Sequence, residues 1–314
     1  MARVSVIVPT FNRLMSLQRC IHSVQRQTER DWELIVLDDQ STDGTADWVV
    51  GESRTDPRLV YHRNLTRMGS ARNISQSLEF ASADFFIVLC DDDYWDKEFL
   101  QHALQASTWR PNIQLVCGRR IAVRDNGKEI RKYVMAYNGV VKPMEAVPRA
   151  LRSGNLFGLN SSVLVGREAA EKAGGFHEEN WTSLDFELYL QIASEYNVAF
   201  AANALSYQVM HGGTETEHVI KSGELVHHEL YMLNRYLSQF GDRLSPAEIQ
   251  RAYLRLYSLA WIFLFVSLPD RKSANLIQQY AFEIRSYLPL SSPWFPVGLN
   301  ALRLGWDRFR RQYT

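Results

Sequence analysis

Cysteine is scarce in this sequence, and neither a long apolar run nor an excess of one charge is present. The 314 residues contain three cysteines, Cys20, Cys90 and Cys117, and their spacing argues against a disulfide framework or a zinc site. Lysine plus arginine and aspartate plus glutamate both total 35, so we predict no nucleic-acid partner. The longest apolar run, residues 259–266, is shorter than the ~20 residues that a membrane-spanning helix needs. We therefore expect a cytoplasmic protein without a signal peptide or a membrane span.

Glycine-rich phosphate loops are also absent. No G-x-G-x-x-G pattern follows the first apolar run, residues 4–8, and no Walker A pattern occurs in the chain. These absences count against a dinucleotide-binding enzyme and a P-loop enzyme. If the protein binds phosphates, their charge must be met by something other than a glycine loop, and a metal ion is the natural candidate.

Short apolar runs alternate with helical patterns through the first 109 residues. We expect strands at residues 4–8, 32–37, 58–61 and 85–89, and helices at residues 14–27, 43–49, 69–80 and 96–109. This alternation predicts an α/β fold with a parallel sheet covered by helices on both faces. Further strands are expected at residues 114–117 and 162–165, a helix at residues 184–196, and a largely helical region after residue 218.

Three consecutive aspartates, Asp91, Asp92 and Asp93, follow the fourth predicted strand. Ligands of such sheets bind beyond the carboxyl ends of the strands, so we expect these carboxylates to line a ligand site. Adjacent carboxylates repel one another unless a cation neutralises them, and oxygen ligands suit Mg²⁺ or Mn²⁺. The alternative is a solvated acidic turn that caps the next helix.

The second predicted strand is also followed by acids, Asp38 and Asp39. A carboxylate at this position can accept hydrogen bonds from a base or from a ribose hydroxyl. Asp43, a few residues later, is explained by capping of the following helix. Capping does not explain why Asp38 and Asp39 sit side by side just past a buried strand.

These motifs, together with residues 4–13, resemble those of the inverting glycosyltransferases of family two in order and spacing. The resemblance covers roughly the first two-thirds of the chain. It implies a GT-A fold, an α/β fold with a Rossmann-like, mostly parallel sheet flanked by helices, here with a helical C-terminal extension. We predict a catalytic domain at residues 1–218 and a helical region at residues 219–314.

The resemblance also implies an activity. The expected enzyme is a hexosyltransferase-type glycosyltransferase that moves a sugar from a nucleoside-diphosphate donor, UDP-sugar being the expected one. The acceptor would be a hydroxyl of a glycan or of a lipid-linked glycan, in surface polysaccharide synthesis. A non-catalytic nucleotide-sugar or glycan-binding subunit is the alternative function. A nucleotidyltransferase is a third, and the missing glycine-rich loop counts against it.

The resemblance assigns nucleotide contacts to the strand ends. Pro9, Thr10 and Phe11 are expected to line the base pocket, and Asp39 is expected to hydrogen-bond the base, usually uracil. Arg72 matches a basic residue near the nucleotide. Two of these assignments have ordinary alternatives, because Phe11 fits a core aromatic and Arg72 fits an exposed helix arginine.

The resemblance places the ribose and metal contacts on the aspartate cluster. Asp91 is expected to touch the ribose, and Asp92 to bind the Mn²⁺ or Mg²⁺ that bridges the two phosphates. Many members of the family have an aspartate where this chain has Cys90, so Asp93 is the alternative ligand. His211 could reach the metal or the diphosphate, since neutral imidazole is a competent ligand for manganese.

The general base is expected at Asp185, which matches the family's position at the start of a helix, with Glu187 as the second candidate. The alternative is that Asp185 only stabilises the helix N-terminus. Residues 155–162 are expected to face the acceptor, and Trp181 could stack on a sugar. Residues 299–313 mix aromatic and arginine side chains, which predicts either an interfacial helix on the inner face of the membrane, or a helix that packs on the domain or on a second copy.

Overall fold

Two compact units make up the chain. One comprises Met1–Val147, Asn155–Glu178 and Leu184–His211, and the other comprises Pro148–Gly154, Glu179–Ser183 and Gly212–Thr314. The computed structural model describes residues 2–211, 224–267, 279–281, 283–284 and 287–288. The predicted domain boundary at residue 218 lies outside these residues and stays a prediction. The predicted helix at residues 299–313 lies outside them too.

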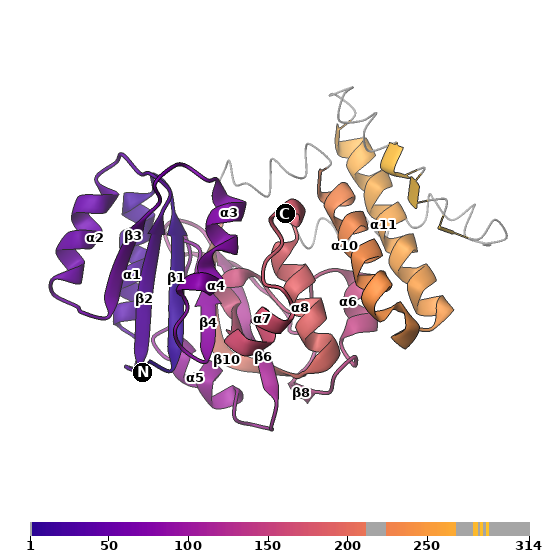
Figure 1. Cartoon of the computed structure of the whole chain (residues 1–314), viewed down its shortest axis with the longest axis horizontal. Helices are drawn as coiled ribbons and strands as arrows, with labels where there is room; N and C mark the ends of the chain where they lie inside the picture. The colour runs from indigo at the N-terminus through magenta and orange to yellow at the C-terminus, as the bar shows by residue number, and fades with distance from the viewer. Residues whose placement is uncertain (1, 212–223, 268–278, 282, 285–286, 289–314) are drawn as a thin grey trace. The chain divides into compact units, whose positions relative to one another are not determined.

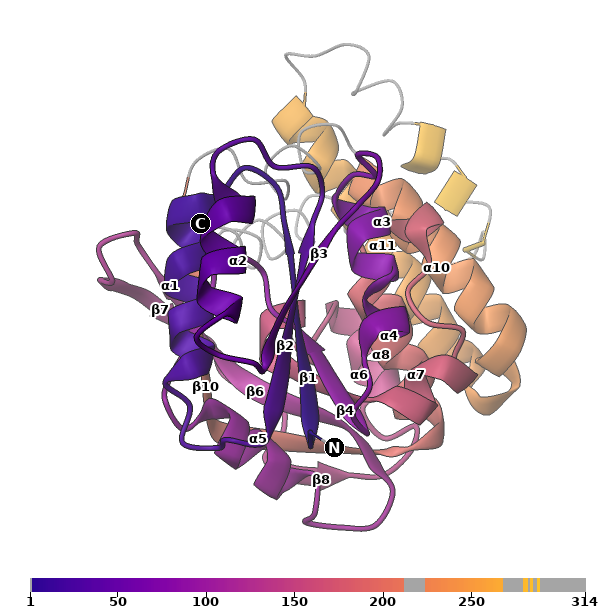
Figure 2. The same cartoon turned by 60° about the vertical axis from the view of Figure 1, so that its left-hand side comes forward.

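The first unit is built on a sheet that begins with four parallel strands. These strands are β1 (Val4–Thr10), β2 (Trp32–Asp38), β3 (Leu59–Arg63) and β4 (Phe85–Val88), in the order β3-β2-β1-β4 (Figure 1). They are connected by α1 (Leu14–Gln25), α2 (Thr45–Ser53), and the pair α3 (Ser70–Ser75) and α4 (Ser77–Phe80). Figure 2 shows α1 on one side of these strands and α3 and α4 on the other. The predicted parallel α/β arrangement is confirmed for this half of the sheet.

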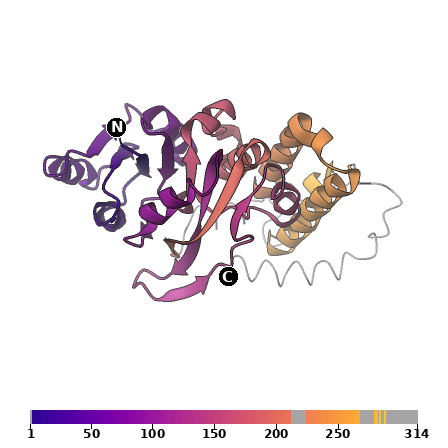
Figure 3. The same ribbon diagram turned by 90° about the horizontal axis from the view of Figure 1, so that it is seen from below.

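The second half of the sheet mixes strand directions. β9 (Val163–Gly166) lies antiparallel between β4 and β6 (Ile113–Val123), and β10 (Asn197–Val209) runs parallel to β6. Figure 3 shows β6, in pink, and β10, in salmon, side by side. Three short strands pair antiparallel with these two: β5 (Tyr94–Trp95) and β8 (Gly139–Val141) with β10, and β7 (Glu129–Lys132) with β6.

The strand β10 was not predicted from the sequence. Several of its buried side chains are alanines, which have little preference for strands. Its pairing with β6 and its packing against α5 (Phe99–Ala106) hold it in the sheet. Gly118 of β6 permits a close approach here, because a Cβ at this position would lie 2.9 Å from the carbonyl oxygen of Ala204 and 3.0 Å from that of Ser162.

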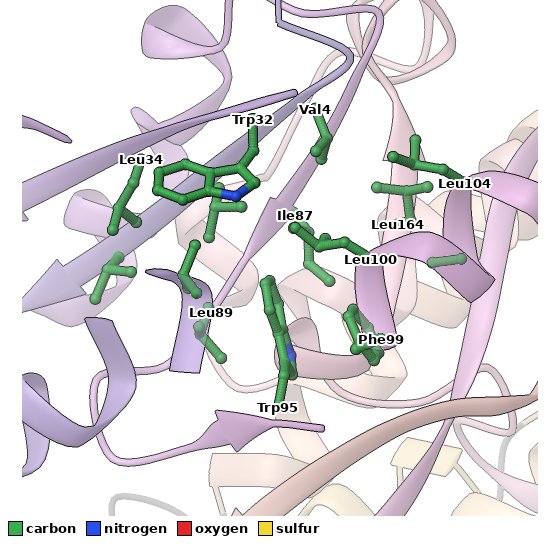
Figure 4. Close-up of a cluster of buried hydrophobic side chains, with 14 of the residues drawn as sticks. Val4, Trp32, Leu34, Ile87, Leu89, Trp95, Phe99, Leu100, Leu104 and Leu164 are labelled. Carbon is green, nitrogen blue, oxygen red and sulfur yellow. The ribbon is translucent and has the colours of Figure 1, made fainter. Parts of the chain in front are cut away.

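A continuous apolar core packs α1 and α5 against one face of the sheet. Leu17, Cys20, Ile21 and Val24 are the buried residues of α1, and their spacing of one, three or four residues places them on one face of the helix. Figure 4 shows side chains of the strands meeting those of the β5–α5 region, and the residues that it labels are Val4, Trp32, Leu34, Ile87, Leu89, Trp95, Phe99, Leu100, Leu104 and Leu164. This core holds β1, β2 and β4 in place, and the loops that follow these strands carry the predicted site residues.

The remaining helices complete the two units. They are α6 (Val147–Ser153), α7 (Arg167–Lys172), α8 (Leu184–Glu195), α10 (Glu224–Phe240) and α11 (Pro246–Ser267), with single 3-10 turns at Asn160–Ser162, Glu178–Asn180 and Gly241–Arg243. α10 and α11 lie side by side in the second unit (Figure 1), where Arg255 pairs with the buried Glu229. Among the residues that the structure describes, no helix is long and apolar enough to cross a membrane.

Candidate active site

The loops that follow β1 and β2 are fastened to each other. Asn12 donates its backbone N–H to Ser41 Oγ (2.9 Å), and its side-chain oxygen accepts the backbone N–H of Thr42 (2.7 Å). Asn12 and Gln40 both have a left-handed backbone, with φ of 52° and 72°. This conformation is uncommon outside glycine and costs conformational energy, which the bonds between the loops offset.

Asp43 caps two helices at once. Its Oδ2 accepts the N–H of Leu14 at the start of α1 (2.8 Å), and its Oδ1 accepts the N–H and the hydroxyl of Thr45 at the start of α2 (3.2 and 2.7 Å). Burial opposes ionisation, but these bonds outweigh it and lower the pKa of Asp43 below its ordinary value of 3.8. Capping therefore accounts for Asp43, as predicted.

The two adjacent acids at the end of β2 have different partners. Asp38 is fully buried and accepts the N–H of Ser41 (2.8 Å) and the hydroxyl of Tyr61 (2.5 Å). Asp39, 3% exposed, accepts three donors from the loop at residues 64–69, at 3.0, 2.7 and 2.8 Å. A carboxylate offers about four acceptor positions, so about one remains on Asp39 for a base. Asp38 is thus a structural anchor, whereas Asp39 shapes the loop beside the predicted nucleotide.

A buried hydrogen bond joins the ends of β1 and β4. Thr10 Oγ1 donates to Asp91 Oδ2 (2.7 Å), and the carbonyl of Thr10 accepts the N–H of Asp39 (2.9 Å). Three strand ends are therefore connected in series. Burial, reinforced by the negative charge of Asp92, raises the pKa of Asp91 from 3.8 to about 6, although Arg13 and the Thr10 bond oppose this.

Asp92 is the most exposed of the three consecutive aspartates, and its carboxylate contacts an arginine guanidinium and a histidine imidazole. Its Oδ2 lies 2.6 Å from Arg13 Nη1 and 2.9 Å from His211 Nε2. Arg19 donates to its backbone carbonyl (2.9 Å). The structure thus brings together Asp92 and His211, which are 119 residues apart in the sequence and were both predicted for the metal site.

Asp93 points inward. It is 4% exposed, and its Oδ1 accepts the N–H of Val209, the last residue of β10 (3.0 Å). Burial and the charge of Asp92 raise the pKa of Asp93 to about 7, although hydrogen bonds to Ser161 and Val209 oppose this. Because Val209 precedes His211 by two residues, Asp93 fastens the end of the strand that delivers the histidine.

Residues 90–93, which we name the acidic turn, begin at Cys90. The N–H of Cys90 donates to Ser161 Oγ (3.0 Å), and burial together with Asp93 and Asp92 raises the pKa of its thiol. One ligand atom from each of Cys90, Asp92 and Asp93 lies within 4.8 Å of the others. Two carboxylates close together in a partly buried place are stabilised by a divalent cation, and their oxygen atoms suit the predicted Mn²⁺ or Mg²⁺.

The segment at residues 155–162 connects the acidic turn to α8. Asn155 Nδ2 donates to the carbonyl of Gly158 (2.8 Å) and more weakly to Asp185 Oδ2 (3.4 Å). The hydroxyl of Tyr189 in α8 donates to Asn160 Oδ1 (3.2 Å), and the next residue along the segment holds the acidic turn. One short segment therefore contacts the predicted base and the predicted metal ligands.

The two candidate bases differ in exposure. Asp185 is half-buried in the first turn of α8, where its Oδ1 accepts the N–H of Phe186 (2.7 Å). Glu187 is 1% exposed. An acceptor hydroxyl has to reach the base, so Asp185 is the better placed of the two.

Some predicted residues lie at the surface. Pro9 and Phe11 are half-buried, and the Arg67 guanidinium lies 4.0 Å above the Phe11 ring. The side chain of Arg72 is 65% exposed and lies 3.9 Å from Glu178. Phe11 is thus not a core aromatic, and its ring packs against the Arg67 guanidinium just after the end of β1.

Trp181 belongs to the second unit, where it packs edge-to-face on His228 with ring centroids 5.8 Å apart. Thr182 Oγ1 lies 3.0 Å from His228 Nδ1. Burial lowers the pKa of His228 to about 4, so this imidazole is neutral at physiological pH. The contact with His228 holds the indole in one orientation.

Three residues of the site were not assigned from the sequence. Arg13 lies within the first motif, yet its ion pair with Asp92 depends on folding. Arg19 has no local signal. Ser161 lies in the segment that we expect to face the acceptor, and its hydroxyl oxygen accepts the N–H of Cys90 in the acidic turn. Pairings across 71 or more residues leave no local pattern to read.

Comparison with known proteins identifies the family of the chain. The family model of Glycosyl transferase family 2 matches residues 5–172, more than half of the chain. The chain belongs to this family and is a glycosyltransferase. It is 26% identical to the Mycobacterium tuberculosis protein MT1568 over 286 residues, 86% of this chain and 87% of that protein. It is 39% identical over 113 residues, 36% of this chain and 35% of the relative, to a Campylobacter jejuni protein named GalNAc(5)-diNAcBac-PP-undecaprenol beta-1,3-glucosyltransferase.

Solved structures share the fold. The mannosyltransferase PcManGT from Pyrobaculum calidifontis, in complex with GDP-Man and Mn²⁺, has a TM-score of 0.59 at 19% identity, over 97% of this chain and 87% of that chain. S. aureus TarS in complex with UDP has a TM-score of 0.58 at 17% identity, over 100% of this chain and 93% of that chain. The predicted GT-A fold is confirmed.

Proposed function

We propose that this glycosyltransferase is inverting and depends on a divalent metal, and that it moves a sugar from a UDP-sugar to a hydroxyl of a lipid-linked or polysaccharide glycan. The observation that carries the proposal is the acidic turn, where Asp92 lies beside His211 at the carboxyl end of the parallel strands. The relative from Campylobacter jejuni is named for an undecaprenol-linked acceptor, and the TarS structure contains UDP. The PcManGT structure contains Mn²⁺.

In this proposal the strand ends hold the nucleotide. Pro9, Thr10 and Phe11 border the base, and Asp39 accepts a hydrogen bond from it through its remaining lone pair. Asp91, next to Thr10, accepts the ribose hydroxyl. Arg72 is exposed and would contact the nucleotide only at its outer edge.

Asp92 would hold the cation, with Asp93 and His211 as the candidates for further ligands. The Mn²⁺ or Mg²⁺ ion would neutralise the charge that develops on the diphosphate as the sugar leaves. Arg13, 2.6 Å from Asp92, places a second positive charge at the same point.

Asp185 would act as the general base. It takes the proton of the acceptor hydroxyl as that oxygen attacks the anomeric carbon from the face opposite the diphosphate. The bond from the anomeric carbon to the diphosphate breaks as the glycosidic bond forms, so the configuration inverts. The Asn155 contact and the N–H of Phe186 orient the carboxylate.

The test measures UDP release and glycan product from a panel of UDP-sugars with Mn²⁺ and a lipid-linked acceptor extract. Asp185→Asn should lower transfer by about 10²–10⁴-fold and leave UDP affinity unchanged, because only proton removal is lost. Glu195→Gln, at the exposed end of the same helix, is the matched control. Near-normal turnover by Asp185→Asn would exclude the base role. Silence with every donor would favour a binding subunit.

A further inference from the structure

Cys90 lies where three donor groups converge. Its backbone N–H donates to Ser161 Oγ, and its Sγ lies within 4.8 Å of a carboxylate oxygen from each of Asp92 and Asp93. Ligand atoms around one tetrahedral ion, with bonds of about 2.0–2.3 Å, lie roughly 3.5 Å apart. One cation can therefore reach all three groups after small side-chain rotations.

We infer that Cys90 is a sulfur ligand of the bound cation and shifts the metal preference of the site towards softer ions than an all-oxygen site selects. This inference rests on the proposed metal-dependent function. On binding, the thiol releases its proton to solvent and the thiolate coordinates the ion, while no electron is transferred. Carboxylates alone suit Mg²⁺, whereas a thiolate favours ions such as Co²⁺ and Zn²⁺.

Cobalt is a direct probe, because a thiolate bound to Co²⁺ gives a sulfur-to-metal charge-transfer band in the near ultraviolet. The full-length protein is titrated with Co²⁺ in the presence of UDP, and bound cobalt is measured by equilibrium dialysis. We expect the band in the wild type and its loss in Cys90→Ser, with cobalt still bound by the aspartates. Cys117→Ala is the matched control, since Cys117 is a fully buried thiol in β6, and its band should equal that of the wild type.

The reverse substitution tests the preference itself. Cys90→Asp restores an all-oxygen set, so the ratio of Co²⁺ affinity to Mg²⁺ affinity should fall by about tenfold or more. Circular dichroism during thermal unfolding checks that each variant folds. The charge-transfer band of the wild type tests the inference even if a variant does not fold.

Two results would overturn the inference and leave the proposed function standing: cobalt bound without a band in the wild type, or an unchanged band in Cys90→Ser. A wild-type protein that binds no divalent ion with UDP would instead remove the metal dependence itself, and the role of Cys90 with it. Asp92→Asn should lose cobalt binding, because Asp92 is the proposed principal ligand. A band that persists in this variant would show cobalt bound to a thiol alone and would also overturn the inference.

Discussion

Removing the carboxyl group of Asp91 should change how the stability of the metal-free protein depends on pH. Burial raises the pKa of this group from 3.8 to about 6, so between these values the folded protein keeps a proton that the unfolded chain has lost. The protonated carboxyl of Asp91 contributes its full share of the stability below pH 3.8, and this contribution is lost as the pH rises through about 6. One pKa unit is about 1.4 kcal/mol, so the loss amounts to roughly 3 kcal/mol.

Asp91→Asn removes the ionisation and keeps an oxygen that can accept the hydroxyl of Thr10. Urea unfolding with EDTA, at a series of pH values, gives the free energy of unfolding of both proteins. Between about pH 4 and pH 7 the variant should lose roughly 2–2.5 kcal/mol less than the wild type, because part of the full difference already lies below pH 4. Asp93 titrates in the same direction in both proteins, so its contribution largely cancels in the difference between them.

Asp43→Asn is a control of opposite sign. Hydrogen bonds lower the pKa of Asp43, so its contribution is present above the ordinary pKa and is lost only as pH falls further. This variant should therefore alter the acid side of the curve and leave the slope above about pH 4 unchanged. Parallel curves for the wild type and Asp91→Asn would refute the reasoning, because a buried carboxyl with a raised pKa must produce the slope.

Two further predictions concern positions outside the acidic turn. Gly118→Ala places a Cβ 2.9 Å from the carbonyl oxygen of Ala204 and should destabilise the protein by about 1–3 kcal/mol. Gly51→Ala in α2, where a Cβ would meet nothing within 4 Å, should stabilise it by about 0.5–1 kcal/mol. Thermal unfolding measures both, and equal shifts of the melting temperature would contradict the packing argument. Asp39→Asn sets an amide group against the N–H donors of the 64–69 loop. The affinity for UDP should fall by about tenfold, and hydrogen exchange at the N–H of Gly69 should become faster. Unchanged protection of this N–H would show that the loop does not depend on the carboxylate.

Local patterns in the sequence predicted the local structure well. The spacing of Leu17, Cys20, Ile21 and Val24 identified the buried face of α1, because a helix presents every third or fourth residue to the same side. The apolar runs that become β1, β2 and β4 were recognisable because strands buried on both faces are apolar throughout. Their ends then located the polar groups of the site.

Long-range packing was not readable in the same way. The strand β10 depends on its neighbours rather than on its own alanine-rich sequence, and the two-residue β5 is too short to show a period. Ser161 and Arg13 gain their partners only when distant segments meet. His211 came from resemblance to a family, and no spacing in the chain connects it to Asp92.

The double capping by Asp43 has a consequence for recognition. One carboxylate caps the N-termini of both α1 and α2, and Asn12 connects the same two loops through its backbone and its side chain. Neither loop can shift without breaking bonds that hold the other, so a nucleotide arriving at this edge of the sheet would meet a rigid rim that is already in its bound shape. Little conformational entropy would then be lost on binding, and selectivity for the base would come from fixed geometry rather than from closure around it.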